Sequence, residues 1–309
     1  MIEQLNSLQS VLAFNGKDNY VSLGKKLEFK IEKEITLEAW VYCQKQRRRT
    51  GIISNVFDTG VSESGYGLLL DGKSGVFFAL KTLSKNIQYF GNKPESLKLN
   101  QWHHVAATYD GQQMKLYLDG VAIAVKSCSD SGIDYEPEND LLIGTYKDNN
   151  ETYPFFGKLA EVRLWKVARI PSEIQQNMHQ SLVGNELGLV GYWPLNEGHS
   201  NMAYDKTSNA NHGIINGANW EQSPVPIVQV KSNFELGVIN TMAKKNPPTA
   251  NSSPSEPKTS PTPEKAAEIE RKLLSTGLED YGFWSQEMAR QKAQQTEPDE
   301  PFRRGRIWC

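Results

Sequence analysis

One stretch restricts the fold of this chain more than any other: "WHHVAATYDGQQMKLYLDGVAIAV", residues 102–125. Three short runs, "HVAATY", "MKLYL" and "VAIAV", are separated by Asp110-Gly111 and Asp119-Gly120. Asp-Gly supplies the positive φ angles that tight hairpin turns require. The stretch therefore predicts a three-stranded antiparallel meander.

Similar strand patterns continue from about residue 10 to residue 220. "EITLEAWVYC" alternates apolar residues with a period of two, as a strand with one core-facing side does. "YGLLLDGKSGVFFAL" reads as a hairpin, "LLIGTY" and "GKLAEVRLWK" as strands, and only "IPSEIQQNMHQSL" as a short helix. Many short strands with Gly and Asp turns predict an all-β fold in which two antiparallel sheets stack as a sandwich.

The composition changes after residue 224. "NPPTANSSPSEPKTSPTP" has almost nothing to bury and is typical of a semi-rigid linker. We therefore divide the chain into a sandwich at 1–230, a linker at 231–263 that is rich in Pro, Ser and Thr from 246, and a tail at 264–309. The tail is predicted to be a short amphipathic helix, disordered until it docks on a partner protein through Ile269, Leu273, Phe283 and Trp284.

Bulk properties exclude several functions. The net charge of −2 and the pI of about 6.3 give no field that would attract nucleic acid. No run approaches the ~18 apolar residues that span a bilayer, so no membrane span is expected. The first residues lack the features of a signal peptide, and three cysteines make a poor disulfide framework. A cytoplasmic location is expected, with unconventional export as an open alternative; the oligomeric state stays open.

Several separated segments together resemble a known family. "VLAFNGKDNYVSL", "ITLEAWVY", "WHHVAATYDGQQMKLYLDGVAIA", "FFGKLAEVRLWKVARIPSEI" and "LVGYWPLNEG" follow one another as in a laminin-G-like domain. Such domains are members of the concanavalin A-like lectin and glucanase superfamily. The resemblance covers about residues 10–220 and implies a two-sheet jelly roll. It leaves the function open, because that superfamily contains lectins, adhesion modules and glucanases.

The resemblance also implies a calcium site. In the family, the loop that corresponds to "FNGKDNYVSLG" often binds one calcium ion, together with a later carboxylate that matches Glu161. Asn15, Asp18 and Asn19 would supply oxygens, although the two asparagines stand where the family usually has Asp. Oxygen ligands of this kind suit a hard cation. The alternative is an ordinary polar turn, where Asn and Gly are common.

Carbohydrate binding is the function that the resemblance favours. The loop aromatic residues Tyr66, Tyr146 and Tyr153 could stack on sugar rings, and Asp148, Asn149 and Asn150 between the last two suit hydroxyl recognition. A glucanase on this fold resembles its relatives in a strand that carries Glu-x-Asp-x-x-Glu, and no glutamate here has that spacing. We therefore expect a non-catalytic module that binds carbohydrate, with calcium assistance. The alternative is a protein-interaction scaffold whose tail docks on a partner or is recognised for export or processing.

Overall fold

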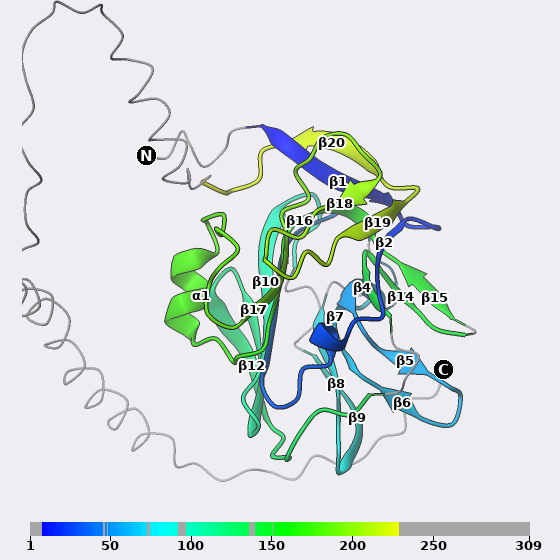
Figure 1. Cartoon of the computed structure of the whole chain (residues 1–309), viewed down its shortest axis with the longest axis vertical. Coiled ribbons are helices and arrows are strands. Elements are labelled where there is room, and N and C mark those ends of the chain that lie inside the picture. The colour runs from blue at the N-terminus through cyan, green and yellow to red at the C-terminus, as the bar shows by residue number, and fades with distance from the viewer. Residues whose placement is uncertain are drawn as a thin grey trace, which may run out of the picture. The chain divides into compact units, whose positions relative to one another are not determined.

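A computed structural model gives the fold of residues 8–45, 47, 49–72, 75–91, 97–135, 140–149 and 151–228. Within these ranges the chain is a two-layer β-sandwich with a single α-helix, α1 at Pro171–Asn177 (Figure 1). The predicted all-β fold of two antiparallel sheets is confirmed. The predicted linker and tail lie outside the described residues, so the division of the chain into domains stays a prediction.

The first sheet, sheet A, is built around the meander that the Asp-Gly turns predicted. Its strand order is β12-β11-β10-β3-β16-β1-β20, and β17 pairs with β16. The strands in this order are Val121–Ser127, Gln113–Leu118, Trp102–Tyr109, Ile35–Cys43, Phe156–Trp165, Gln9–Asn15 and Asn219–Ser223, with β17 at Leu189–Trp193.

The second sheet, sheet B, has the order β18-β19-β2-β13-β4-β7-β8-β9. These strands are Met202–Ala203, Gly213–Asn216, Tyr20–Gly24, Leu141–Ile143, Thr50–Ser54, Tyr66–Leu70, Val76–Thr82 and Lys85–Gly91. Two further hairpins stand beside it: β5 (Phe57–Asp58) with β6 (Glu63–Ser64), and β14 (Thr145–Lys147) with β15 (Thr152–Pro154). A 3-10 helix lies at Leu27–Phe29.

The main core lies between the two sheets. In β3, Leu37, Ala39 and Val41 are completely buried in this core, as their alternation predicted. Tyr66 also belongs to the core, where its hydroxyl donates to the Phe29 carbonyl at 2.9 Å. The expectation that Tyr66 lies in a loop and is open to a ligand is therefore wrong. Tyr66 is the first residue of β7, and its side chain lies on the face of the strand that is turned to the core.

A second apolar layer covers the outer face of sheet A. Val11, Trp40 and Ala160 lie on that face and contact Val225 and Ile227, which follow β20. The segment therefore packs back on its own sheet, and the sandwich extends at least to residue 228. Within the described residues, no helix has the length and apolar character to cross a membrane.

Candidate functional site

The loop between β1 and β2 is closed by its own hydrogen bonds. The Asn15 side-chain oxygen accepts the backbone N–H of Lys17 at 2.8 Å, and the Asn19 side-chain oxygen accepts the backbone N–H of Asn15 at 2.8 Å. Asp18 Oδ1 accepts the side-chain amides of Asn15 at 2.8 Å and of Asn19 at 3.3 Å. The oxygens predicted to bind a cation thus serve as turn acceptors.

Glu161 lies far from this loop along β16. The pairing of β1 with β16 sets Asn15 opposite Phe156, and Glu161 is five residues further on, about 16 Å at 3.3 Å per residue. A β-bulge interrupts β16 here, because Ala160 pairs with Trp40 whereas Arg163 pairs with Glu38. Glu161 adopts a φ of 54° in the bulge. Bulges of this kind redirect a side chain.

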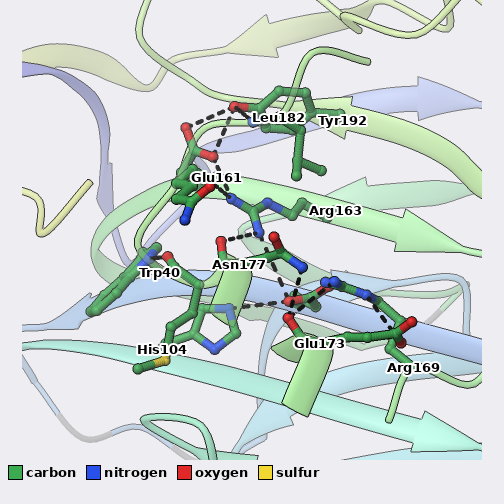
Figure 2. A network of polar contacts seen from close by, with 12 residues as sticks. Trp40, His104, Glu161, Arg163, Arg169, Glu173, Asn177, Leu182 and Tyr192 are labelled. Carbon is green, nitrogen blue, oxygen red and sulfur yellow. Dashed lines mark hydrogen bonds and ion pairs between the residues drawn. The ribbon is translucent and has the colours of Figure 1, made fainter. Parts of the chain in front are cut away.

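The bulge places Glu161 in a buried ionic group on the outer face of sheet A, which we call the arginine–glutamate network: Glu38, Glu161, Arg163, Arg169 and Tyr192 (Figure 2). Arg163 donates to Glu161 at 2.8 Å, and the Tyr192 hydroxyl lies 2.8 Å from the same carboxylate. Arg169 donates to Glu38 at 2.7 Å. Two carboxylates and two guanidinium groups therefore balance each other in charge.

Residues of helix α1 and the turn after it contact this network; Figure 2 shows Glu173 and Asn177 beside Arg163 and Arg169. Arg163 donates to the carbonyls of Asn177 at 3.2 Å and Gln180 at 2.6 Å, while Arg169 donates to the carbonyl of Glu173 at 3.1 Å. The Trp40 indole donates to the Met178 carbonyl at 2.6 Å. The network therefore fastens α1 and the following turn to sheet A. This is a structural role.

The pKa values of Glu161 and Glu38 are shifted in opposite directions. Burial raises the pKa of Glu161, against the lowering effects of Arg163 and Tyr192. For Glu38, burial raises the pKa, but the hydrogen bond from His104 and the charges of Arg169 and Arg163 lower it to about 2. Both groups belong to the closed network.

The predicted calcium ligands therefore do not fit the ion as they stand. The structure keeps Glu161 apart from Asn15, Asp18 and Asn19, because the β-bulge turns it toward Arg163. Among the described residues, no group of three or more His, Cys, Asp or Glu side chains could hold a metal ion. Calcium binding remains an expectation from the family resemblance, and the separation of these residues argues against it.

The predicted sugar loop is the β14–β15 hairpin, and it does bring its aromatic residues together. The rings of Tyr146 and Tyr153 are stacked, with centroids 5.7 Å apart. The Tyr146 hydroxyl donates to Asp148, whose other oxygen accepts the N–H of Glu151 at 2.7 Å. Asn149 is exposed at the tip, and Asn150 lies outside the described residues.

Tyr146 differs from the expectation because it is only 5% exposed. Its ring packs on the outer face of sheet B against Val56, Leu69 and Ala79, with Tyr153 partly buried beside it. The backbone of β14 can cross β4 because residue 51 is glycine, where a Cβ would lie 2.3 Å from the Thr145 carbonyl group. The buried Tyr146 ring thus supports the hairpin against sheet B, whereas the partly buried Tyr153 ring is the one that a ligand can reach.

Residues that the sequence reasoning missed complete this surface. Tyr89 on β9 is 37% exposed, and its hydroxyl donates to Glu63 at 2.8 Å. Glu63 stands directly opposite Asp58 in the β5–β6 hairpin, and the Arg49 guanidinium lies over the Tyr89 ring, 5.6 Å from its centroid. Figure 1 shows the β5–β6 and β14–β15 hairpins on the same side of the sandwich.

Side-chain packing brings the two hairpins to one surface, because Val56, next to β5, clusters with Tyr146 and Tyr153 of the β14–β15 hairpin. Burial raises the pKa of Glu63, and the charges of Asp58 and Asp148 raise it further, against the hydrogen bond from Tyr89. Burial also raises the pKa of Tyr146, with contributions from Asp148, Tyr89 and Asp58. We call this surface the aromatic–acidic face; it consists of Asp58, Glu63, Tyr89, Tyr146, Asp148 and Tyr153.

The "FDTGVSES" hairpin could have been found from its Gly60 turn, where the Gly60 N–H binds Asp58 at 2.6 Å. The position of this hairpin beside Tyr89 could not have been found from the sequence, because the contact joins residues that are far apart in the chain. The predicted docking residues Ile269, Leu273, Phe283 and Trp284 lie outside the described residues, and tail docking stays a prediction.

Two clefts that are open to solvent have linings without any residue of this face. One, of about 590 Å³, is bordered by Leu27, Lys30 and Glu32; another, of about 410 Å³, lies beside Trp165 and Arg169. An oligosaccharide does not need such a cavity, because an exposed aromatic ring offers a flat apolar surface with polar groups at its edge. The aromatic–acidic face is therefore the better candidate.

Comparison with known proteins places this sandwich in a family. The profile of the concanavalin A-like lectin/glucanases superfamily (Laminin_G_3) matches residues 15–175, more than half of the chain. The chain belongs to this superfamily. The resemblance found in the separate sequence segments is thereby confirmed.

Individual relatives are distant or much longer. Pappalysin-1 of Mus musculus is 29% identical over 181 residues, which is 54% of this chain but 11% of pappalysin-1, and pappalysin-1 of Homo sapiens gives the same values. A crystal structure from Bacteroides ovatus, provisionally described as a carbohydrate-binding protein, has a TM-score of 0.56 and 23% identity. It covers 71% of this chain and 61% of its own, and this likeness concerns the fold alone.

Proposed function

We propose that this chain is a non-catalytic module that binds carbohydrate on the aromatic–acidic face. The observation that carries the proposal is the partly exposed Tyr89 ring beside the Glu63 and Asp58 carboxylates. Aromatic rings pack on the apolar faces of sugar rings, and a few convergent polar groups fix a ligand's orientation. Tyr153 extends this surface on the second hairpin.

Membership of a superfamily that contains lectins supports the binding of a sugar. Calcium is not part of the proposed site, because the residues expected to bind it lie elsewhere: Asn15, Asp18 and Asn19 in the β1–β2 loop and Glu161 in β16. The absence of a catalytic step is also proposed. Glu38 and Glu161, two carboxylates of sheet A, are buried and paired with arginines, so they cannot reach a glycosidic bond.

The test is a glycan array with the full chain, followed by calorimetry on the sugars that bind. Tyr89→Ala and Tyr153→Ala should each weaken binding by about 5- to 150-fold, since truncating a contact residue that contributes to binding costs about 1–3 kcal/mol and each 1.4 kcal/mol is tenfold. Tyr204→Ala is the matched control, because Tyr204 is 38% exposed, as Tyr89 is 37% exposed, and follows β18 at the opposite edge of sheet B.

Three results would contradict the proposal. The array could show no binding above background, the Tyr89 and Tyr153 variants could bind as the wild type does, or Tyr204→Ala could lose binding equally. Release of reducing ends from a bound oligosaccharide, lost in Glu63→Gln, would contradict the non-catalytic part alone.

A further inference from the structure

The β5–β6 hairpin holds two like charges directly across from each other. Asp58 and Glu63 are register partners in this antiparallel pair. Like charges at directly opposed positions destabilise a β-ladder. Asp148, on the second hairpin, adds a third negative charge that acts on Glu63. The repulsion between these carboxylates therefore destabilises the hairpin, and a positively charged group placed between them reduces that repulsion.

The chain already places one cation of its own at this position. The Arg49 guanidinium lies over the Tyr89 ring at 5.6 Å, and its charge acts on Glu63. Arg49 has a φ of 53°, a backbone conformation that is uncommon for a residue other than glycine. A strained residue thus presents a positive group to an aromatic ring next to a carboxylate, which is how proteins recognise ammonium ligands.

Asp58 and Glu63 are register partners, Asp148 binds the hydroxyl of Tyr146 on the neighbouring hairpin, and the Arg49 guanidinium lies over the Tyr89 ring. These named residues carry three carboxylates and one guanidinium group, so negative charge is in excess among them. A sugar with a free ammonium group gains attraction to the carboxylates and a cation–π contact with tyrosine. A sugar with a carboxylate is repelled, and a neutral sugar gains neither term.

We propose that the aromatic–acidic face selects amino sugars with a free, protonated amine over their N-acetylated forms and over acidic sugars. This inference rests on the proposed carbohydrate binding and adds the chemical class of the ligand. The ammonium group occupies the space between the Tyr89 ring and the Glu63 and Asp58 carboxylates, beside Arg49 or in its place.

The experiment compares matched ligands by calorimetry with the full chain. The probes are glucosamine tetrasaccharide, the N-acetylglucosamine tetrasaccharide of the same length and linkage, and sialyllactose as an acidic sugar. At a pH where the amine is protonated, the free amine form should bind about 2- to 5-fold more tightly than the acetylated form, a ratio expected for a charge pair in partly exposed surroundings. The ratio should fall as salt is added.

Three variants locate the effect. The Asp58→Asn/Glu63→Gln double variant should bring the ratio close to 1. Arg49→Asn should raise it, because it removes the competing cation and Asn tolerates a positive φ. Glu221→Gln is the control: it removes a partly exposed carboxylate from β20, in the other sheet, and should keep the wild-type ratio. Thermal melts of each variant establish that it is folded.

The outcomes separate the inference from the proposed function. Equal affinity for both tetrasaccharides, or preference for sialyllactose, overturns the inference while carbohydrate binding stands. A preference that survives in the double variant places the ammonium elsewhere and also overturns it. Binding to none of the glycans on the array overturns the proposed function and the inference together.

Discussion

Replacing Arg163 with methionine should destabilise the sandwich by about 3–5 kcal/mol, the cost of leaving one partner of a buried ion pair without the other. Arg163 is completely buried and donates to Glu161 at 2.8 Å and to the carbonyls of Asn177 and Gln180 at 3.2 and 2.6 Å. Methionine keeps most of the aliphatic volume. It leaves the Glu161 carboxylate buried with the Tyr192 hydroxyl as its donor.

Thermal and urea unfolding followed by circular dichroism measure the effect. For a domain of this size, about 2–4 °C in Tm corresponds to each kcal/mol, so Tm should fall by about 6–20 °C. The control is Lys115→Met, which removes an ion pair with Asp110 at 3.3 Å whose side chains are 28% and 34% exposed. That change should cost less than about 1 kcal/mol, because exposed ion pairs contribute little.

The pH dependence gives a second, independent readout. Burial already raises the pKa of Glu161 above its usual value, and Arg163 opposes this. Without Arg163 the pKa rises further, so the native state of the variant takes up a proton at a pH where the unfolded chain does not. The stability deficit of Arg163→Met should therefore shrink as the pH falls toward the unfolded pKa of Glu.

A second substitution tests whether the unpaired Glu161 carboxylate causes the loss of stability. Glu161→Gln in the Arg163→Met background should recover at least half of the lost stability, because the amide carries no charge. If Arg163→Met costs less than about 1 kcal/mol, or if its deficit neither changes with pH nor responds to Glu161→Gln, the ionic account of this network is wrong.

Three further predictions concern the same domain. The surroundings hold the folded-state pKa of Glu38 at about 2, below its usual 4.5. The Glu38 carboxylate therefore stabilises the fold above pH 4.5, and this contribution is lost as the pH falls toward 2. Glu38→Gln should flatten this part of the acid-unfolding curve. Millimolar calcium should leave Tm unchanged relative to chelator in both the wild type and Asp18→Ala; a calcium-dependent rise in Tm that Asp18→Ala abolishes would restore the loop as a metal site. A chain that ends at residue 230 should unfold cooperatively, whereas one that ends at 223 should lose about 3–6 kcal/mol, from burial of Val225 and Ile227 at about 1.5–3 kcal/mol each. Equal urea midpoints would show that these side chains contribute nothing.

The sequence by itself determined the strands and their turns. Asp110-Gly111 and Asp119-Gly120 produce the meander β10–β11–β12, and the alternation in "EITLEAWVYC" places Leu37, Ala39 and Val41 in the core. These features depend on residues that are close in the chain, where turn chemistry and a period of two act directly. The family resemblance followed from the same local segments.

Tertiary structure alone decided what the polar residues do. Glu161 matched a calcium ligand in the linear pattern, but a one-residue bulge in β16 turned it toward Arg163. Tyr146 was expected to face a ligand, but β14 crosses β4 at Gly51 and buries its ring. Local patterns set which residues alternate, whereas a bulge or a close crossing of strands sets which side chains meet.

The aromatic–acidic face has the same origin. Glu63, Tyr89 and Asp148 come from three segments that are 26 and 59 residues apart in sequence, counted from 63 to 89 and from 89 to 148. No local period or motif links them. They meet because the β5–β6 and β14–β15 hairpins lie beside β9 on one side of sheet B, an arrangement fixed by contacts between residues far apart in the chain.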